Sequence, residues 1–231
     1  MVRKYAFFCF IGIDGSGKTT QALSLNDYFK EKGLNSKYVW SRREPCISKI
    51  PGKLIKRYIL KEREATEGHA YLSIKKKRKG LFGNKIVSFL LINFSLLEYL
   101  FLLYLKIFIP NRNNDVLICD RYLYDAIVDF ALNCPFPLSM VDTLLKNLIS
   151  NRFPKPDRLY FIDINADVGV SRKKDGTSEA YLEDRIPLYQ YIAQIAGATI
   201  VDGTLPLNDI KKTIHEDAAK VFKRNHSNFN A

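Results

Sequence analysis

Cysteine is scarce in this 231-residue chain, and none of its four cysteines forms a C-x-x-C pair. This spacing argues against a disulfide framework and against a cysteine-based zinc site. Cys9 and Cys119 lie inside apolar runs. We therefore expect them to be small buried side chains of a protein from a reducing compartment. The other two cysteines are Cys46 and Cys134.

The sequence also lacks a Pro/Gly/Ser-rich linker and an internal repeat. We therefore expect one domain over residues 1–231, a length that allows a sizeable core. The apolar run near the N-terminus is short and continues directly into a glycine-rich stretch. It predicts a strand rather than a signal peptide.

Acidic residues are outnumbered, with 24 Asp and Glu against 36 Lys and Arg, so the formal net charge is +12. A basic excess indicates an anionic partner, which can be a nucleotide, a nucleic acid or an acidic lipid. Basic residues are dense in residues 61–80, which include Lys75-Lys76-Lys77-Arg78-Lys79. Such a run is typical of a solvated face, with a nucleic-acid or lipid-headgroup site as the alternative.

The chain does contain a phosphate-binding loop, because residues 12–19 match the pattern G-x-x-x-x-G-K-[ST]. Its glycines let backbone N–H groups point at phosphate oxygens. An apolar run at 5–11 predicts a strand before the loop, and helical spacing over 20–32 predicts a helix after it. We expect the ATP phosphates to be bound by Gly12, Asp14, Gly15, Ser16, Gly17, Lys18, Thr19 and Thr20.

Apolar segments alternate with helical patterns along the rest of the chain, which predicts an α/β fold. Further strands are predicted at residues 37–40, 116–119, 159–164 and 198–201. Helices are predicted at residues 124–132, 139–151, 166–171, 182–196 and 206–223, with a frayed polar tail from 225. We expect a three-layer P-loop NTPase fold, in which helices flank a five-stranded parallel sheet.

The most apolar part of the chain, residues 86–109, predicts a long apolar helix. Its length meets the requirement for a membrane span, but a charged Glu98 would be costly in lipid. A helix that is apolar on all sides can instead be buried in a core or a subunit interface. We favour a homodimer that covers this helix, and membrane association is the alternative.

Charged residues follow two predicted strands at their carboxyl ends, where ligands bind in open α/β sheets. Asp120 is placed to hold Mg²⁺ together with Thr19, and the adjacent Arg121 could neutralise a transferring phosphoryl group. After the strand at 37–40, Arg42 and Arg43 could clamp a phosphate, although a solvated turn is the alternative.

A basic segment at residues 172–180 follows the predicted helix at 166–171. Arg172, Lys173 and Lys174 precede Gly176, which could act as a hinge. Such a segment could close over nucleotide phosphates as a small helical lid. A charged helix end that is favoured by the helix dipole is the alternative.

Several motifs together resemble the thymidylate kinase family over roughly residues 4 to 220. Residues 10–21 are similar to its opening F-E-G-x-D-G-x-G-K-T-T-Q, and Arg43-Glu44-Pro45 is similar to its R-E-P turn. Asp120-Arg121-Tyr122 resembles its D-R-Y/F/H motif. Its later landmarks are matched by Pro156-Asp157, Asp163 and Val201-Asp202-Gly203.

The resemblance implies a cytoplasmic, homodimeric nucleoside monophosphate kinase of nucleotide biosynthesis. ATP with Mg²⁺ is the implied donor, dTMP is the leading acceptor, and nucleic acid is not an expected partner. The implied catalytic residues are Lys18, Arg121, Arg43, Arg172 and Lys173. The implied acceptor contacts are Asp14, Arg43, Arg121, Tyr99 and Asp125, and the implied metal contacts are Thr19 and Asp120.

The sequence departs from the family pattern where the acceptor base should be read. No arginine or glutamine stands near residues 98–101, and Asp125 and Phe130 replace the usual serine and glutamine. Gly15 occupies a position where some members carry an arginine, so Arg172, Lys173 or Lys174 should supply that charge. A site without its hydrogen-bonding groups discriminates less. The alternatives are a phosphotransferase with another nucleotide, a nucleoside or a small alcohol as acceptor, or a membrane-associated nucleotide-binding protein with little kinase activity.

Overall fold

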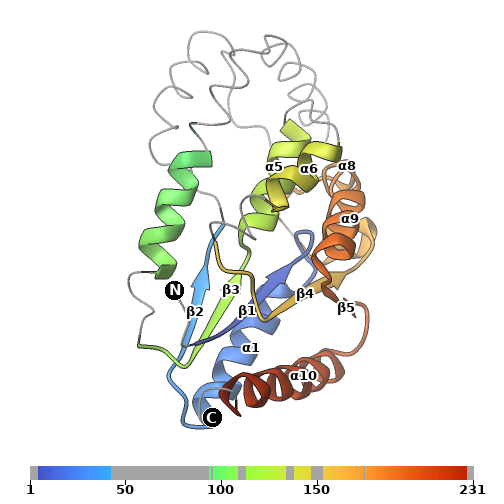
Figure 1. The fold of residues 1–231 in the computed structure, drawn as a ribbon. Helices are drawn as coiled ribbons and strands as arrows, with labels where there is room; N and C mark the ends of the chain where they lie inside the picture. The colour runs from blue at the N-terminus through green and yellow to red at the C-terminus, as the bar shows by residue number, and fades with distance from the viewer. Residues whose placement is uncertain are drawn as a thin grey trace.

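A computed structural model describes residues 5–42, 94, 96–108, 113–133, 138–146, 153–173 and 175–227. One sheet of five strands, in the order β2-β3-β1-β4-β5, runs through the described part of the chain (Figure 1). Every neighbouring pair is parallel, which confirms the predicted sheet. The strands are β1 (Ala6–Ile11), β2 (Ser36–Trp40), β3 (Val116–Asp120), β4 (Arg158–Asp163) and β5 (Thr199–Asp202).

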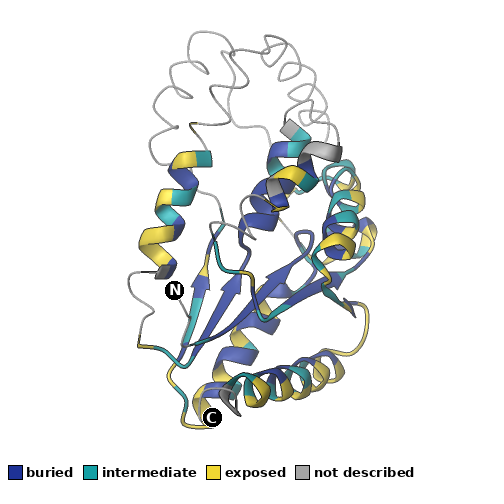
Figure 2. Cartoon of the chain, in the orientation of Figure 1, coloured by how far each residue is buried: buried dark blue, intermediate teal, exposed yellow. Residues whose placement is uncertain are grey.

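The central strand β1 is buried along its whole length (Figure 2). Its side chains alternate between two hydrophobic cores, with Phe7 and Cys9 in one and Phe8 and Phe10 in the other. A parallel strand that is covered on both faces needs apolar residues at every position, since successive side chains point to opposite faces. This requirement explains the uninterrupted apolar run in the sequence.

Helices cover both faces and complete the predicted three layers. The face of Phe8 packs against α1 (Lys18–Glu31) and α10 (Leu207–Ser227). The face of Phe7 packs against the other layer, whose helices are α5 (Leu123–Asn133), α6 (Leu138–Leu145), α7 (Ala166–Arg172), α8 (Glu179–Glu183) and α9 (Ile186–Ala196).

Two predicted helix boundaries were wrong. The helix expected over 182–196 is divided into α8 and α9, because Pro187 lacks an N–H and fits only the first turn of a new helix. The tail expected to fray from 225 remains helical to Ser227. The helix is anchored by the buried Val221 close to its end.

The long apolar helix expected over 86–109 is not present as such among the described residues. Residues 94 and 96–103 are α-helical, and the chain then passes into the π-helix η2 (Tyr104–Phe108). Tyr99, Leu103 and Ile107 are buried, whereas the opposite side is exposed. In the described ranges, no helix is long and apolar enough to span a membrane.

Cys9 and Cys119 are buried and unpaired, as predicted, and burial raises the pKa of both thiols. Other predictions lie outside the described residues. These are the basic segment at 61–80, Cys46, Cys134, Arg43-Glu44-Pro45 and Lys174.

The start of β4 is held by a reciprocal pair of hydrogen bonds between Asp157 and Phe7. The Phe7 N–H donates to Asp157 Oδ2 at 2.7 Å, and the Asp157 N–H donates to the Phe7 carbonyl at 2.7 Å. Asp157→Ala should lower the free energy of unfolding by about 1–3 kcal/mol, because it leaves a buried N–H without its acceptor. Urea denaturation would measure the change. Asp27→Ala on the exposed side of α1 is the matched control, and equal stability of the two variants would contradict the prediction.

Candidate active site

The phosphate-binding loop joins β1 to α1 with its glycines in left-handed conformations. Gly15 has φ +84°, and a Cβ there would run into the backbone carbonyl of Gly169 in α7. Only glycine allows both this backbone angle and this close approach. The loop is thus packed directly against the helix that precedes the predicted lid segment.

Lys18, at the start of α1, turns back over the loop instead of pointing into solvent. Its Nζ donates to the Ile13 carbonyl at 2.8 Å and lies 3.7 Å from Asp14 Oδ1. Burial and the nearby Arg121 disfavour a charged amine more than Asp14 favours it, so the pKa of Lys18 falls to about 8. An added phosphate would reverse this balance by supplying negative charge.

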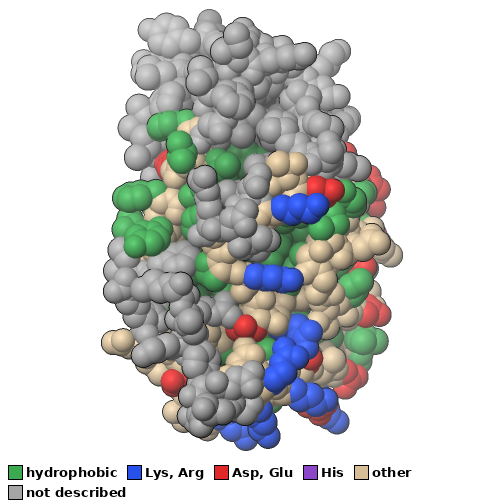
Figure 3. Space-filling view, in the orientation of Figure 1, with side chains coloured by type: hydrophobic (Ala, Val, Ile, Leu, Met, Phe, Trp, Pro, Cys, Tyr) green, Lys and Arg blue, Asp and Glu red, His purple; other side chains and the backbone are tan. Residues whose placement is uncertain are grey.

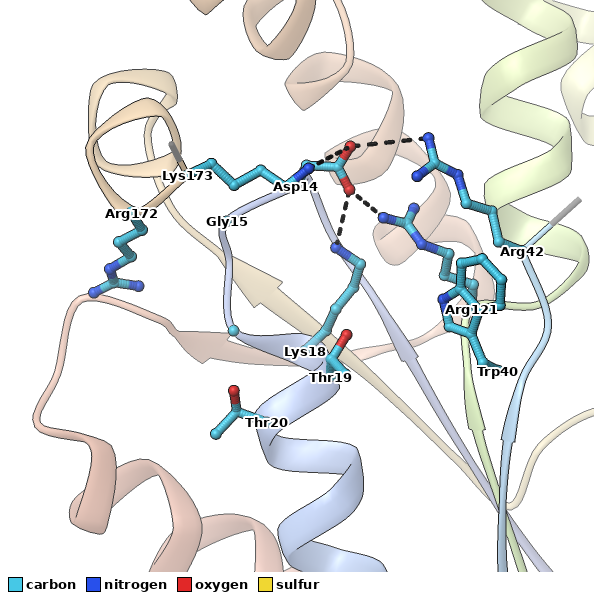
Figure 4. Close-up of a pocket in the computed structure, with 11 residues that line it drawn as sticks. Asp14, Gly15, Lys18, Thr19, Thr20, Trp40, Arg42, Arg121, Arg172 and Lys173 are labelled. Atoms are coloured by element: carbon cyan, nitrogen blue, oxygen red, sulfur yellow. Dashed lines mark hydrogen bonds and ion pairs between the residues drawn. The ribbon is translucent and has the colours of Figure 1, made fainter. Parts of the chain in front are cut away.

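Asp14 is the point where four cations meet (Figure 4). Its Oδ1 is paired with Arg121 and approached by Lys18, while Oδ2 lies 4.0 Å from Arg42 and 3.9 Å from Lys173. Burial opposes ionisation of this carboxyl group. The four charges outweigh burial and hold the pKa of Asp14 well below its usual range. Asp14 is not the only counter-charge, because Arg121 is also paired with Asp125 and Lys173 with Asp175.

Arg121 is fixed between two carboxylates. Besides Asp14, its Nη1 donates to Asp125 Oδ1 at 3.0 Å, and the Tyr189 hydroxyl donates to the same oxygen at 2.6 Å. Within the described part of the chain, Arg121 is the one non-glycine residue with positive φ, at 70°. Its N–H still donates to the Phe10 carbonyl at 3.0 Å. The bend at the end of β3 therefore directs a buried guanidinium at the phosphate loop.

Asp120 and Thr19 form the predicted metal position. Asp120 is completely buried, and its Oδ2 accepts hydrogen bonds from Thr19 Oγ1 at 2.5 Å and from the Tyr38 hydroxyl at 3.1 Å. Its Oδ1 has no hydrogen-bond partner. An unpartnered buried carboxylate oxygen beside a hydroxyl fits Mg²⁺, which prefers oxygen ligands and retains several waters. The described residues hold no group of three or more His, Cys, Asp or Glu side chains that could bind a metal by themselves.

A cavity of about 450 Å³ opens over the loop. Most of the predicted site residues line it, and two lining residues, Trp40 and Arg42, come from the end of β2. The full lining is Asp14, Gly15, Gly17, Lys18, Thr19, Thr20, Trp40, Arg42, Arg121, Arg172 and Lys173. Six of the eight predicted phosphate-binding residues line the cavity together with Arg172 and Lys173 of the predicted lid, whereas Gly12 and Ser16 do not.

Arg172 and Lys173 diverge within this cavity. Arg172 Nη1 donates to the Gly203 carbonyl at 2.9 Å, in the turn after β5. Lys173 Nζ is paired with Asp175 Oδ2 at 2.6 Å and also lies 3.9 Å from Asp14 Oδ2. Figure 4 shows the two side chains on the same side of the loop, pointing in different directions.

Tyr99 and Asp125, predicted to contact the acceptor, are both buried and are not among the residues that line the cavity. The Tyr99 hydroxyl donates to the Ser41 carbonyl at 3.0 Å, and Asp125 supports Arg121. The contacts described for the two side chains are thus with the protein elements that carry Arg42 and Arg121.

Sequence reasoning missed Tyr38 and Tyr189. The position of Tyr38 could have been predicted, because residues 38 and 40 share one face of the strand that ends just before Arg42 and Arg43. Tyr189 had none, since it meets Asp125 across 64 positions of sequence.

The sequence profile of the family described as thymidylate kinase matches residues 10–217. A thymidylate kinase from Wolbachia pipientis subsp. Culex pipiens is 30% identical over 221 residues, which cover 94% of this chain and 91% of that protein. A probable thymidylate kinase from Methanococcus aeolicus is 27% identical over 225 residues, with 94% of each chain covered. A thymidylate kinase from Fervidobacterium nodosum is 24% identical over 224 residues, covering 94% of this chain and 98% of that protein.

The lowered pKa of Lys18 predicts a pH dependence of nucleotide binding. Below pH 8 the amine is already charged, so the affinity for MgATP should change little. Above pH 8 the free protein must take up a proton to bind phosphate, and the dissociation constant should rise by up to about tenfold per pH unit. Calorimetry at pH 8.5 in two buffers of different ionisation enthalpy should show proton uptake. A constant affinity from pH 7 to 9.5, without proton uptake, would contradict the expectation.

Proposed function

Because the chain belongs to the thymidylate kinase family, we propose that it transfers the γ-phosphoryl group of ATP to dTMP, giving dTDP and ADP. The observation that carries this proposal is the convergence of Lys18, Arg42, Arg121 and Lys173 on Asp14 inside one cavity at the phosphate loop. No finding favours the alternative acceptors or a membrane-associated protein with little kinase activity.

The cavity lining carries five basic side chains and one carboxylate, and this excess of positive charge suits transfer between two phosphates. An oxygen of the acceptor phosphate attacks the γ-phosphorus, so the protein needs no nucleophilic side chain. Catalysis then depends on positioning and on neutralising the charge of the two reactants. Lys18 and the loop backbone would hold the donor phosphates, and Arg121 would lie between donor and acceptor.

We propose that Mg²⁺ binds beside Thr19 and Asp120, because the free Oδ1 of that aspartate and the adjacent hydroxyl fit the ion. When bound, the ion would neutralise charge on the donor phosphates. Of Arg172 and Lys173, Lys173 fits the charge missing at Gly15 better, because its Nζ lies 3.9 Å from Asp14 as well as 2.6 Å from Asp175, whereas Arg172 donates to the Gly203 carbonyl.

For the acceptor, we propose direct contacts from Asp14, Arg43 and Arg121. Tyr99 and Asp125 would contribute to acceptor binding by holding neighbouring residues in place. Tyr99 supports the backbone beside Arg42, and Asp125 supports Arg121. We also propose a cytoplasmic location, where ATP and a reducing environment for the unpaired cysteines are both present.

A panel of nucleoside monophosphates with ATP, followed by ADP release, tests the reaction. We expect dTMP to be phosphorylated best. Lys18→Ala should lower kcat/KM by at least about a hundredfold, because it removes a charged ligand of the transferring phosphate. Turnover of another acceptor but not of dTMP or dUMP would refute the substrate assignment. Survival of activity in Lys18→Ala would refute the role of the phosphate loop.

We further propose a homodimer formed through the exposed apolar side of helical residues 94 and 96–105. Large hydrophobic side chains are exposed here, and they comprise Phe94, Leu97, Phe101, Tyr104 and Leu105. Figure 3 shows groups of hydrophobic side chains on this side of the molecule. Exposed apolar groups of this kind are typical of an interaction site. Light scattering should give twice the mass of one chain for the wild-type protein and one mass for Leu97→Asp. A wild-type monomer would exclude the dimer.

A further inference from the structure

The four cations around Asp14 are held with very different strength. Arg121 is buried and paired with two carboxylates, and Lys18 is buried and bonded to a backbone carbonyl. Arg42 and Lys173 lie on the same oxygen, Oδ2, at 4.0 Å and 3.9 Å, and their side chains are 39% and 31% exposed. Lys173 is also paired with Asp175 at 2.6 Å, whereas the ion pair described for Arg42 is the contact at 4.0 Å. A partly exposed pair at this distance contributes little energy, so Arg42 can exchange Asp14 for a ligand.

The backbone next to Arg42 is nevertheless held in place by hydrogen bonds. The preceding residue, Ser41, donates its N–H to the Asp120 carbonyl at 3.0 Å and its hydroxyl to the Arg121 carbonyl at 2.5 Å. Its own carbonyl accepts the Tyr99 hydroxyl at 3.0 Å. Three hydrogen bonds thus fix the chain at the base of a side chain that remains free to turn within the cavity.

The sheet order places Arg42 and Arg172 on opposite sides of the phosphate loop. The loop follows the central strand β1, Arg42 follows the edge strand β2, and Arg172 contacts the turn after the other edge strand, β5. Figure 4 shows Arg42 and Trp40 on one side of Asp14 and Arg172 on the other. Arg42 also approaches Oδ2, whereas Lys18 approaches Oδ1. Arg42 therefore enters the cavity from the side of β2, opposite to Arg172 (Figure 4).

We propose that Arg42 binds the phosphate of the acceptor, which takes the place of the Asp14 carboxylate when the acceptor enters. The planar guanidinium can donate two parallel hydrogen bonds to a phosphate, which a lysine cannot. The inference rests on the proposed function, since it concerns the acceptor half of the same site.

Steady-state kinetics of Arg42→Ala with ATP and dTMP tests the proposal. The KM for dTMP should rise by about tenfold to a hundredfold, with a lower kcat, as expected for lost hydrogen bonds to a charged group. The KM for ATP should stay within about twofold, because the loop ligands are unchanged. Arg42→Lys should recover only part of the lost affinity for dTMP, since lysine restores the charge but cannot donate two parallel hydrogen bonds.

Lys37→Ala is the matched control, because it removes one positive charge from the same strand outside the cavity lining. It should leave both KM values unchanged. Thermal unfolding of the variants separates a kinetic effect from a loss of folded protein. An Arg42→Ala enzyme with an unchanged KM for dTMP, or with a raised KM for ATP alone, would overturn the inference and leave the kinase assignment intact.

A binding measurement covers the case in which dTMP is not phosphorylated. Trp40 is the only tryptophan of the chain and lines the cavity, so its fluorescence reports on this site. With the loop saturated by Mg²⁺ and a non-hydrolysable ATP analogue, inorganic phosphate should produce a saturable change in the wild-type protein. Arg42→Ala should require about tenfold more phosphate. Equal affinities, or no change in the wild-type protein, would then overturn the role of Arg42.

Discussion

The ion pair between Arg121 and Asp14 is the interaction on which the site depends. It connects the phosphate loop after β1 to the end of β3, and Asp125 extends the connection to α5. Tyr189 extends it again to α9. Buried charges are tolerated only when they are paired and hydrogen-bonded, so each member of this chain of contacts limits where the next can lie. The geometry of the cavity therefore depends on four separate elements of the fold.

Much of the fold could be predicted because its signals are local. A fully apolar strand such as β1 predicts a parallel sheet with both faces covered, and the glycine pattern after it predicts the phosphate loop. The break between α8 and α9 was missed because the helical spacing continues across it. Pro187 carried the correct signal, as a residue that fits the first turn of a new helix.

The candidate site was predictable only as far as its motifs reach. Four predicted residues belong to motifs with a fixed chemical meaning. Three of them, Lys18, Thr19 and Arg121, line one cavity, and the fourth, Asp120, accepts a hydrogen bond from Thr19. Arg172 donates to the Gly203 carbonyl and Tyr189 donates to Asp125, and both partners are distant in sequence. Contacts of this kind cannot be predicted from the spacing of residues within a motif. The sequence does not predict which base the acceptor carries, because the residues expected to contact that base differ from the family pattern.

The contact between Gly15 and Gly169 also bears on how such sites evolve. The loop and α7 meet backbone to backbone, and a Cβ at Gly15 would collide with the Gly169 carbonyl oxygen, so a side chain there would require them to separate. An arginine at position 15 and this close packing are therefore mutually exclusive arrangements. A lineage cannot pass from one to the other by a single substitution without an intermediate of damaged structure. With α7 packed against the loop, additional positive charge can be carried by neighbouring positions instead, such as Arg42 after β2 and Lys173 after α7.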